Sequence, residues 1–359
     1  MTRNDQPAPS ERLVGLAEVA DLLQVSRQAV TNWRSRRGDF PAPVADLKSG
    51  PIWRHSEVLG WAKAKEIDVA EDAAFDLSDT AATVVVAVMN MKGGVGKSTL
   101  TANLGWYCAY KRNQRVLLVD LDPQFNLSQY IMGNAGYEEH LDAGKGTVLD
   151  IFEQATPPRV AKRNKETLSP ATVISRVQEW SDGSYIDLVP ASLDLSWTLK
   201  NPTGKEHLLE HFLNDMRGDY DIVLIDCAPT DSMLTTAAYL ASDSILIPVK
   251  PEFLSTIGLP LLVRSLKDFE RSYKRSVDVL GIVFNASADK LEHDRSRTFV
   301  RKVATENGWE VFDSEVSYSD SYPKGSRLGR PIFLTDYARA YKVTNFLAVA
   351  DEFMGKLET

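Results

Sequence analysis

The 359-residue sequence has little cysteine, no long apolar run and no excess of basic residues. Its two cysteines, Cys108 and Cys227, exclude a disulfide framework and a cysteine-ligated cluster, and both are predicted to be small buried side chains. No apolar stretch approaches the ~18 residues of a membrane span, and no signal peptide is expected. A net charge of −8 predicts that nucleic-acid binding would depend on local basic patches. The composition is that of a cytosolic globular protein with one large and one smaller core.

What the sequence does contain is a glycine-rich turn directly after a β-branched run. Residues 84–88 are apolar, and residues 92–99 read Lys-Gly-Gly-Val-Gly-Lys-Ser-Thr. Glycines let the backbone curl until its N–H groups face an anion, and the start of the following helix adds positive partial charge. This pattern predicts a phosphate-binding P-loop, in which Lys97 would reach the β- and γ-phosphates and Ser98 would hold Mg²⁺. The predicted nucleotide-binding residues are Gly93, Gly94, Val95, Gly96, Lys97, Ser98 and Thr99.

Two further apolar runs end in acidic residues. Residues 115–119 lead into Asp120 and Asp122, and residues 221–225 lead into Asp226. Such short apolar runs are typical of strands buried in a parallel sheet, whose carboxyl ends form the ligand-binding edge. A single Asp at a strand end could merely cap the next turn. Three acids in this order after a P-loop favour nucleotide hydrolysis.

The glycine-rich turn departs from the usual P-loop at its start, where Met91 replaces the first glycine and a second lysine, Lys92, follows. In this the sequence resembles the deviant Walker box of the ParA/MinD ATPases. The resemblance to ParA-type partition ATPases extends over roughly residues 83–353. It implies that Lys92 crosses a dimer interface to the partner's nucleotide, that Asp226 holds Mg²⁺ through water, and that Asp122 orients the attacking water.

The same resemblance implies the fold and the remaining site residues. The fold is α/β, a doubly wound and mostly parallel sheet, and the activity is Mg²⁺-dependent hydrolysis of ATP. Asp120 would be a more distant Mg²⁺ partner, and Asn285, after the strand-like residues 281–284, would meet adenine. The implied catalytic residues are Lys92, Lys97 and Asp122, and the implied metal-site residues are Ser98, Asp120 and Asp226.

The first 66 residues have a different character. Residues 13–36 are predicted to form two short helices, with Ser26 as N-cap of the second, and residues 40–44 and 50–54 suggest a wing before a helix over 56–65. The segment resembles the winged helix-turn-helix of MerR- or excisionase-like regulators, although any small three-helix unit gives similar spacing. Its polar side chains could reach base edges or phosphates. The candidate DNA-binding residues here are Arg27, Gln28, Thr31, Asn32, Arg34 and Arg54.

The alanine-rich, acidic residues 67–82 are predicted to be a solvated linker. The expected domains are therefore a winged helix-turn-helix over 1–66, this linker, and a ParA-type P-loop ATPase domain over 83–359. A second irregular stretch is predicted over about 133–166, and residues 341–357 are predicted to pack in the core rather than anchor to a membrane.

Basic residues gather in the C-terminal third, in one group at helical spacing and in a second group predicted to lie in a loop. These candidate DNA-binding residues are Arg264, Lys267 and Arg271, and Lys324, Arg327 and Arg330. In ParA-type relatives this region carries sequence-independent DNA contacts, which phosphate neutralisation explains. Tyr318 and Ser321 stand where many relatives have arginines, so transfer of those DNA contacts to this chain stays open. Each group alone could instead be a solvated helix face.

We therefore expect an ATP-dependent DNA segregation ATPase for plasmid or chromosome partition, cytoplasmic and nucleoid-associated, with no membrane partner. Two subunits would sandwich two ATP·Mg²⁺, and the homodimer would bind DNA non-specifically. A ParB-like centromere-binding partner would stimulate hydrolysis, and the N-terminal domain would bind an operator and repress the protein's own operon. The alternatives are a nucleotide-sensing transcriptional regulator and a positioning ATPase for another cargo.

Overall fold

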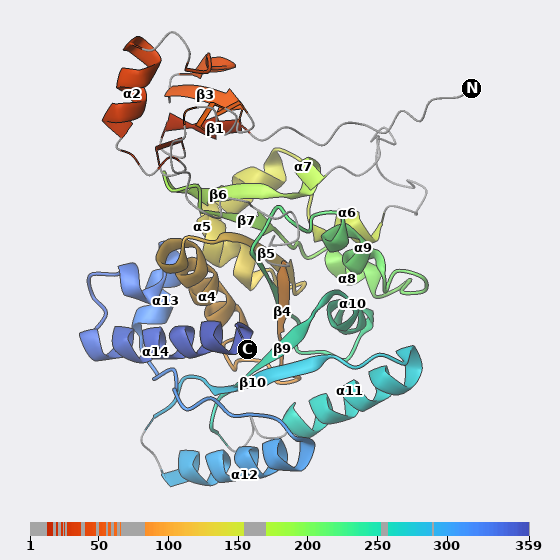
Figure 1. Cartoon of the computed structure of the whole chain (residues 1–359). Coiled ribbons are helices and arrows are strands. Elements are labelled where there is room, and N and C mark those ends of the chain that lie inside the picture. The colour runs from red at the N-terminus through yellow and green to blue at the C-terminus, as the bar shows by residue number, and fades with distance from the viewer. Residues whose placement is uncertain are drawn as a thin grey trace. The chain divides into compact units, whose positions relative to one another are not determined.

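The structure is a computed structural model, and it divides the chain into two compact units, Met1–Thr80 and Ala81–Thr359 (Figure 1). It describes residues 13–16, 19, 20, 23, 25, 27–36, 40–47, 50–54, 57, 58, 61, 62, 65, 83–153, 170–252, 258–288 and 291–358. The predicted linker over 67–82 lies outside the described residues.

The smaller unit contains an antiparallel sheet and a helix. Its strands, in the order β1-β3-β2, are β1 (Leu13–Gly15), β3 (Gly50–Arg54) and β2 (Ala45–Leu47). Helix α2 (Arg27–Arg36) is described along its whole length, and further helical residues stand at 16, 19, 20, 57, 58, 61 and 62. The core is aromatic: Trp53 is fully buried and donates its indole N–H to the Pro41 carbonyl (2.8 Å), and Phe40 packs edge-on against Trp53 and Trp61. Strand β1 was not predicted: residues 13–15 pair with β3, before the first helix predicted, over 16–23. The helical residues 16, 19 and 20 belong to that predicted helix and 57, 58, 61 and 62 to the helix predicted over 56–65, and Ser26, the predicted N-cap, lies outside the described residues.

The larger unit is built on a seven-stranded sheet in the order β10-β9-β4-β8-β5-β7-β6. The strands are β4 (Val84–Val88), β5 (Arg115–Leu121), β6 (Ser175–Glu179), β7 (Tyr185–Val189), β8 (Ile222–Cys227), β9 (Ser244–Val249) and β10 (Asp278–Phe284). Every pairing is parallel except that of the edge strand β6 with β7. The predicted doubly wound, mostly parallel sheet is confirmed, whereas β6 was not predicted.

Helices cover both faces of this sheet (Figure 1). One face packs against α4 (Lys97–Arg112), α5 (Asn126–Asp142), α13 (Ser321–Arg327), the 3₁₀ turn η2 (Ile332–Leu334) and α14 (Ala340–Leu357). The other packs against α6 (Val148–Phe152), α7 (Pro170–Val173), α8 (Leu195–Thr198), α9 (Leu208–Asn214), α10 (Met233–Ala241), α11 (Gly258–Tyr273) and α12 (Leu291–Asn307). Strand β4 serves both layers, because Val85 and Ala87 face one and Val86 and Val88 the other.

Two predictions of irregular chain are wrong in part: the stretch predicted over about 133–166 is helical up to residue 142, α6 stands where a short helix was expected within it, and residues 154–166 lie outside the described residues. Helix α5 continues to residue 142 because Gly133 (φ 70°, ψ 161°) interrupts it without ending it, and Tyr137 beyond this kink is buried. Lys324 and Arg327 lie in α13 rather than in a loop. Pro323 does not prevent that helix, because it stands in the first turn, where a backbone N–H has no helical partner.

Two other predictions are confirmed. Cys108 and Cys227 are buried free thiols. Helix α14 packs in the core through Phe346, Val349 and Phe353. Among the described residues, no helix is both long and apolar enough to cross a membrane.

Candidate nucleotide site and basic surfaces

The glycine-rich loop joins the carboxyl end of β4 to the start of α4. Gly94 (φ 74°) and Gly96 (φ 84°) both have left-handed backbone conformations, which glycine adopts without strain. Gly96 directly precedes α4 and has no side chain to cap it, so the first N–H groups of the helix remain available to an anion. A Cβ atom at Gly96 would lie 2.3 Å from the Asn285 Nδ2 atom, so any other residue there would displace the Asn285 amide and would strain the left-handed backbone.

Lys97 is a buried cation in this loop. Its side chain is 6% exposed, and its ammonium group has one long hydrogen bond, to the Lys92 carbonyl (3.4 Å). Burial lowers the pKa of Lys97, while the nearby carboxylates of Asp226 and Asp122 oppose that shift. An ammonium group that is desolvated and weakly bonded would gain strongly from a phosphate ligand.

Asp226 and Asp120 lie side by side on the paired strands β8 and β5, and both are fully buried. Neither carboxylate oxygen of Asp226 has a hydrogen-bond partner in the described part of the chain. Burial, then Asp120, raises the pKa of Asp226, and the neighbouring Ser98 and Lys97 oppose the shift. Asp226 is therefore a buried acid that still has oxygen atoms to offer a ligand.

Asp120, in contrast, already uses both oxygens within the protein. They accept hydrogen bonds from the Ser128 N–H (2.8 Å), the Ser128 hydroxyl (2.6 Å) and the Asp122 N–H (3.2 Å). Burial raises the pKa of Asp120 to about 7, although these hydrogen bonds lower it. Asp120 thus fits a supporting position better than direct metal contact.

The residues present fit Mg²⁺ as P-loop proteins hold it. Among the described residues, no group of three or more His, Cys, Asp or Glu could hold a metal ion by itself. Mg²⁺ bound to a nucleotide takes most of its oxygen ligands from phosphates and water, so one hydroxyl and one nearby carboxylate suffice. Ser98 and the unpartnered Asp226 would supply these two groups.

Asp122 and Lys92 flank the same site. Asp122 is 6% exposed, and its Oδ1 atom accepts the Gln124 N–H (2.9 Å), which fixes the turn after β5. The Lys92 N–H donates to the Asn90 Oδ1 atom (3.0 Å), and the Asn90 amide in turn donates to the Pro248 carbonyl (2.9 Å). Sequence reasoning missed Asn90. A polar residue between an apolar strand and the loop is the signal that could have found it.

Asn285 lies against the P-loop rather than offering a free amide. Its Nδ2 atom donates to the Val95 carbonyl (2.8 Å), and its Oδ1 atom accepts the Ala286 N–H (3.0 Å). A cavity of 790 Å³ begins two residues further along the chain, at Ser287. The Ser287 hydroxyl is buried and has no hydrogen-bond partner among the described residues.

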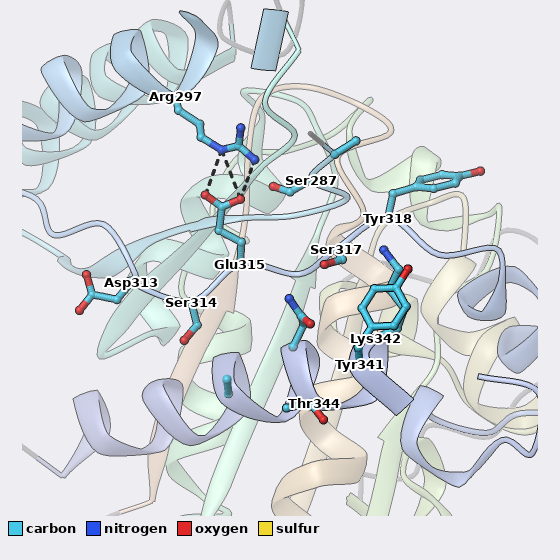
Figure 2. A pocket seen from close by; sticks show the side chains of 13 residues that line it. Ser287, Arg297, Asp313, Ser314, Glu315, Ser317, Tyr318, Tyr341, Lys342 and Thr344 are labelled. Atoms are coloured by element: carbon cyan, nitrogen blue, oxygen red, sulfur yellow. Dashed lines mark hydrogen bonds and ion pairs between the residues drawn. The ribbon is translucent and has the colours of Figure 1, made fainter. Parts of the chain in front are cut away.

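Figure 2 shows this cavity between two walls. The Arg297–Glu315 ion pair (2.8 Å) stands on one side, and Tyr341 and Lys342 of α14 stand on the other, with Tyr318 above them. Tyr318 thus lines a polar cavity together with Ser287, two residues after Asn285.

The two candidate basic groups differ in how far their charges are already balanced. On α11, Arg264 and Arg271 both pair with Asp268, at 3.6 and 2.6 Å; Lys267 is exposed. The second group, here called the basic segment, comprises Lys324, Arg327 and Arg330. All three are exposed and none makes an ion pair within the described residues; Lys324 lies 5.5 Å from the centre of the Tyr337 ring.

In the smaller unit, Thr31 and Arg34 are exposed on α2, Asn32 is half-buried and Val30 is buried. The side chains of Arg27, Gln28 and Arg54 lie outside what the structure describes, although their backbones belong to α2 and β3.

The fold and the site together define a P-loop nucleotide-binding protein, and comparisons with known proteins narrow the class. A family model described as an AAA domain matches residues 83–279. An uncharacterized protein of Mycobacterium tuberculosis is 34% identical over 251 residues, 69% of this chain and 71% of its own. The chromosome partitioning protein ParA of Caulobacter vibrioides is 29% identical over 70% of this chain and 87% of its own, and the cell division protein PomZ of Myxococcus xanthus is 28% identical over 69% and 71%.

Solved structures agree on the fold. Apo McdA from Cyanothece superposes with a TM-score of 0.61 at 18% identity, covering 75% of this chain and 99% of its own. Cobyrinic acid a,c-diamide synthase from Mycobacterium smegmatis, with a bound ATP analog and magnesium, has a TM-score of 0.54 at 26% identity and covers 68% and 92%. The chain belongs to the ParA-type deviant Walker ATPases.

Proposed function

We propose that this protein is an ATP-dependent DNA-partition ATPase that works as an ATP-bound homodimer. The observation that carries the proposal is the presence, in one unit, of a deviant P-loop and of a basic segment whose three exposed cations make no ion pair among the described residues. The first feature binds nucleotide, and the second attracts a polyanion.

ATP and Mg²⁺ are the ligands of the nucleotide site. The N–H groups of residues 94–99 and the Lys97 ammonium hold the phosphates, and Ser98 and Asp226 hold Mg²⁺, with Asp120 supporting Asp226 from the neighbouring strand. The metal ion neutralises charge on the phosphate oxygens. Asp122, whose turn is fixed by the Gln124 N–H, orients the water that attacks the γ-phosphate.

Lys92 acts across the dimer. Lys97 serves the β- and γ-phosphates of its own subunit. The Lys97 ammonium group also donates a hydrogen bond to the Lys92 carbonyl (3.4 Å), so the two lysines belong to the same loop. A second lysine at the same loop neutralises the nucleotide of the partner subunit, so that ATP joins two copies symmetrically. The adenine then lies toward Asn285, beside the cavity at Ser287.

DNA meets the ATPase unit without sequence preference, mainly at the basic segment and more weakly at α11, where Asp268 offsets Arg264 and Arg271. A ParB-like centromere-binding protein stimulates hydrolysis and releases the DNA. The smaller unit is a winged helix-turn-helix, in which α2 reads an operator of the protein's own operon through Thr31, Asn32 and Arg34, together with Arg27, Gln28 and Arg54. The protein acts in the cytoplasm, on the nucleoid.

Two other functions share this machinery. A nucleotide-sensing transcriptional regulator would bind one operator and have little affinity for other DNA. A positioning ATPase would carry a cargo other than DNA. The similarity to PomZ, a cell division protein, supports this alternative.

Fluorescence anisotropy distinguishes the partition ATPase from the transcriptional regulator. The full-length protein is titrated against a random-sequence duplex and against its own promoter, in ATP, in ADP and without nucleotide. Partition predicts ATP-dependent binding of both duplexes. Arg327→Ala and Arg330→Ala should each lower the log–log salt slope by roughly one, whereas Arg112→Ala, a surface cation already paired with Glu358, should leave it unchanged. Affinity for the promoter alone, whatever the nucleotide, would overturn the partition proposal in favour of the regulator.

A further inference from the structure

A buried asparagine joins the nucleotide-binding helix α4 to the chain just after the basic segment. Asn103 is fully buried, and its Nδ2 atom donates to the Thr99 carbonyl (2.7 Å) and to the Tyr130 hydroxyl (3.0 Å). Its Oδ1 atom accepts the N–H of Ile332 (2.8 Å). The amide thus uses both donors and its acceptor, and two of these bonds lead away from α4.

Tyr130 on α5 extends this network to the basic segment itself. It is 4% exposed, and its hydroxyl donates to the Arg330 carbonyl (3.0 Å) while it accepts from Asn103. The fit is close, because a Cβ atom at Gly325 would lie 2.7 Å from the Arg330 oxygen and 3.5 Å from the Tyr130 hydroxyl. The main chain that carries Arg330 is therefore held by α4 and α5 together.

Both helices begin at the nucleotide site. Helix α4 starts at Lys97, and α5 follows the turn in which the Asp122 carbonyl accepts the Phe125 N–H (2.8 Å). Asn103 lies less than two helical turns from Lys97, and Tyr130 lies one turn into α5. A shift of either helix on nucleotide binding acts directly on the hydrogen bonds to Arg330 and Ile332.

Next to this hydrogen-bond network, the surface between α5 and α13 has the polar and basic groups that bind a polyanion. A cavity of 450 Å³ lies between α5 and α13; its lining includes Gln129, Asn134, Ser326 and Arg327, and none of the described residues that line it is acidic. Amide and guanidinium donors without a competing carboxylate match the phosphodiester backbone of DNA.

We propose that Asn103 and Tyr130 are positioning residues that couple the nucleotide state to the affinity of the basic segment for duplex DNA. This rests on the proposed function. The coupling is a free energy shared between two sites, so nucleotide changes DNA affinity by the same factor by which DNA changes nucleotide affinity. Tyr130 also lines the cavity between α5 and α13, but its hydroxyl bonds to Asn103 and to the Arg330 carbonyl, so removing that hydroxyl breaks the connection and keeps the aromatic ring in place.

The test compares Tyr130→Phe with Tyr137→Phe. Both tyrosines are buried on α5 at 4% exposure, and the Tyr137 hydroxyl also donates to a backbone carbonyl, that of Ala191 (2.8 Å), on the other side of the Gly133 kink. Each full-length variant is measured for DNA affinity in ATP and in ADP, and for ATP affinity with and without the random duplex. Circular dichroism confirms that each variant is folded.

In the wild type, we expect the ratio of DNA affinities in ATP and ADP to be at least about fivefold, within the usual range of allosteric coupling. Tyr130→Phe should bring that ratio, and its reciprocal measured on ATP, close to one, with ATP affinity in the absence of DNA unchanged. Tyr137→Phe should keep both ratios. Asn103→Ala should likewise bring the ratio of DNA affinities in ATP and ADP close to one. This variant replaces Tyr130→Phe in the test if Tyr130→Phe does not fold.

A Tyr130→Phe protein that keeps the wild-type ratio would overturn the coupling role while leaving the proposed function intact. A wild type whose DNA binding ignores nucleotide would overturn both. An equal loss of coupling in both tyrosine variants would also reject the specific role of the network, because Tyr137 has no bond to the basic segment.

Discussion

Replacing Asp226 by Asn is expected to stabilise the metal-free protein while removing its Mg²⁺-dependent function. The carboxylate is fully buried and neither oxygen has a hydrogen-bond partner among the described residues. Burial and the adjacent Asp120 raise its pKa. An unperturbed Asp titrates near pH ~4, so the unfolded chain ionises this group above that pH, whereas burial in the folded protein disfavours the ionised form.

The size of the effect follows from the desolvated carboxyl group, whose oxygens have no hydrogen-bond partner among the described residues. Burying such a group costs on the order of 1–3 kcal/mol. Asparagine cannot ionise and recovers part of this cost, about 1 kcal/mol, which raises the Tm of a domain of this size by about 2–4 °C. A folded-state pKa above the unfolded value means that stability is lost as pH rises, so the gain is small near pH ~4 and grows toward pH ~7.

Thermal unfolding followed by circular dichroism, in EDTA and across this pH range, measures the gain; Asp142→Asn, at an exposed position of α5, is the control. Adding ATP and Mg²⁺ should raise the Tm of the wild type and not that of Asp226→Asn. The reasoning is refuted if Asp226→Asn has the same pH dependence as wild type, or if ATP and Mg²⁺ still stabilise it equally.

Three further predictions concern the loop and its neighbours. Asp122→Ala should bind ATP and dimerise but lose hydrolysis by about a hundredfold or more, since the attacking water is no longer oriented; phosphate release at the wild-type rate would contradict this role. Lys92→Gln should weaken the ATP-bound dimer far more than it weakens ATP binding, and sedimentation showing an unchanged dimer would remove the cross-subunit assignment. Gly96→Ala should abolish nucleotide binding measured by calorimetry, because its Cβ would lie 2.3 Å from Asn285, whereas Gly94→Ala, with open space around it, should incur only the backbone cost of about 1–2 kcal/mol.

The sequence predicted the central strands and the P-loop well for a local reason. A strand buried on both faces, such as β4, must be apolar at every position, and the glycines that follow are required by backbone conformations that other residues adopt only with strain. The acids at the carboxyl ends of β5 and β8 were found in the same way, because polar residues ending an apolar run are visible in one sequence.

Reasoning from local pattern failed where a tertiary contact overrides it. Residues 13–15 form a strand because β3 offers them an edge, and α5 continues beyond Gly133 because buried residues such as Tyr137 hold its second half in the core. Lys324 and Arg327 were predicted to lie in a loop, yet they belong to α13, because a proline in a first turn is compatible with a helix. None of these outcomes has a signature within a few residues.

The sequence by itself determined the chemistry of this protein: which loop can hold phosphate, which lysine departs from the usual pattern, and which acids stand at strand ends. Only the tertiary structure decided which of these groups still has hydrogen-bonding atoms or unpaired charge available to a ligand. Asp120 and Asp226 are the same residue type at paired positions, but Ser128 and the Asp122 N–H take up the two oxygens of the first and nothing described takes up those of the second. Likewise Asp268 offsets the arginines of α11, whereas no acid in the described part of the chain forms an ion pair with the basic segment. Hydrogen bonds and ion pairs between distant segments depend on three-dimensional proximity, and a linear pattern of residue types does not contain it.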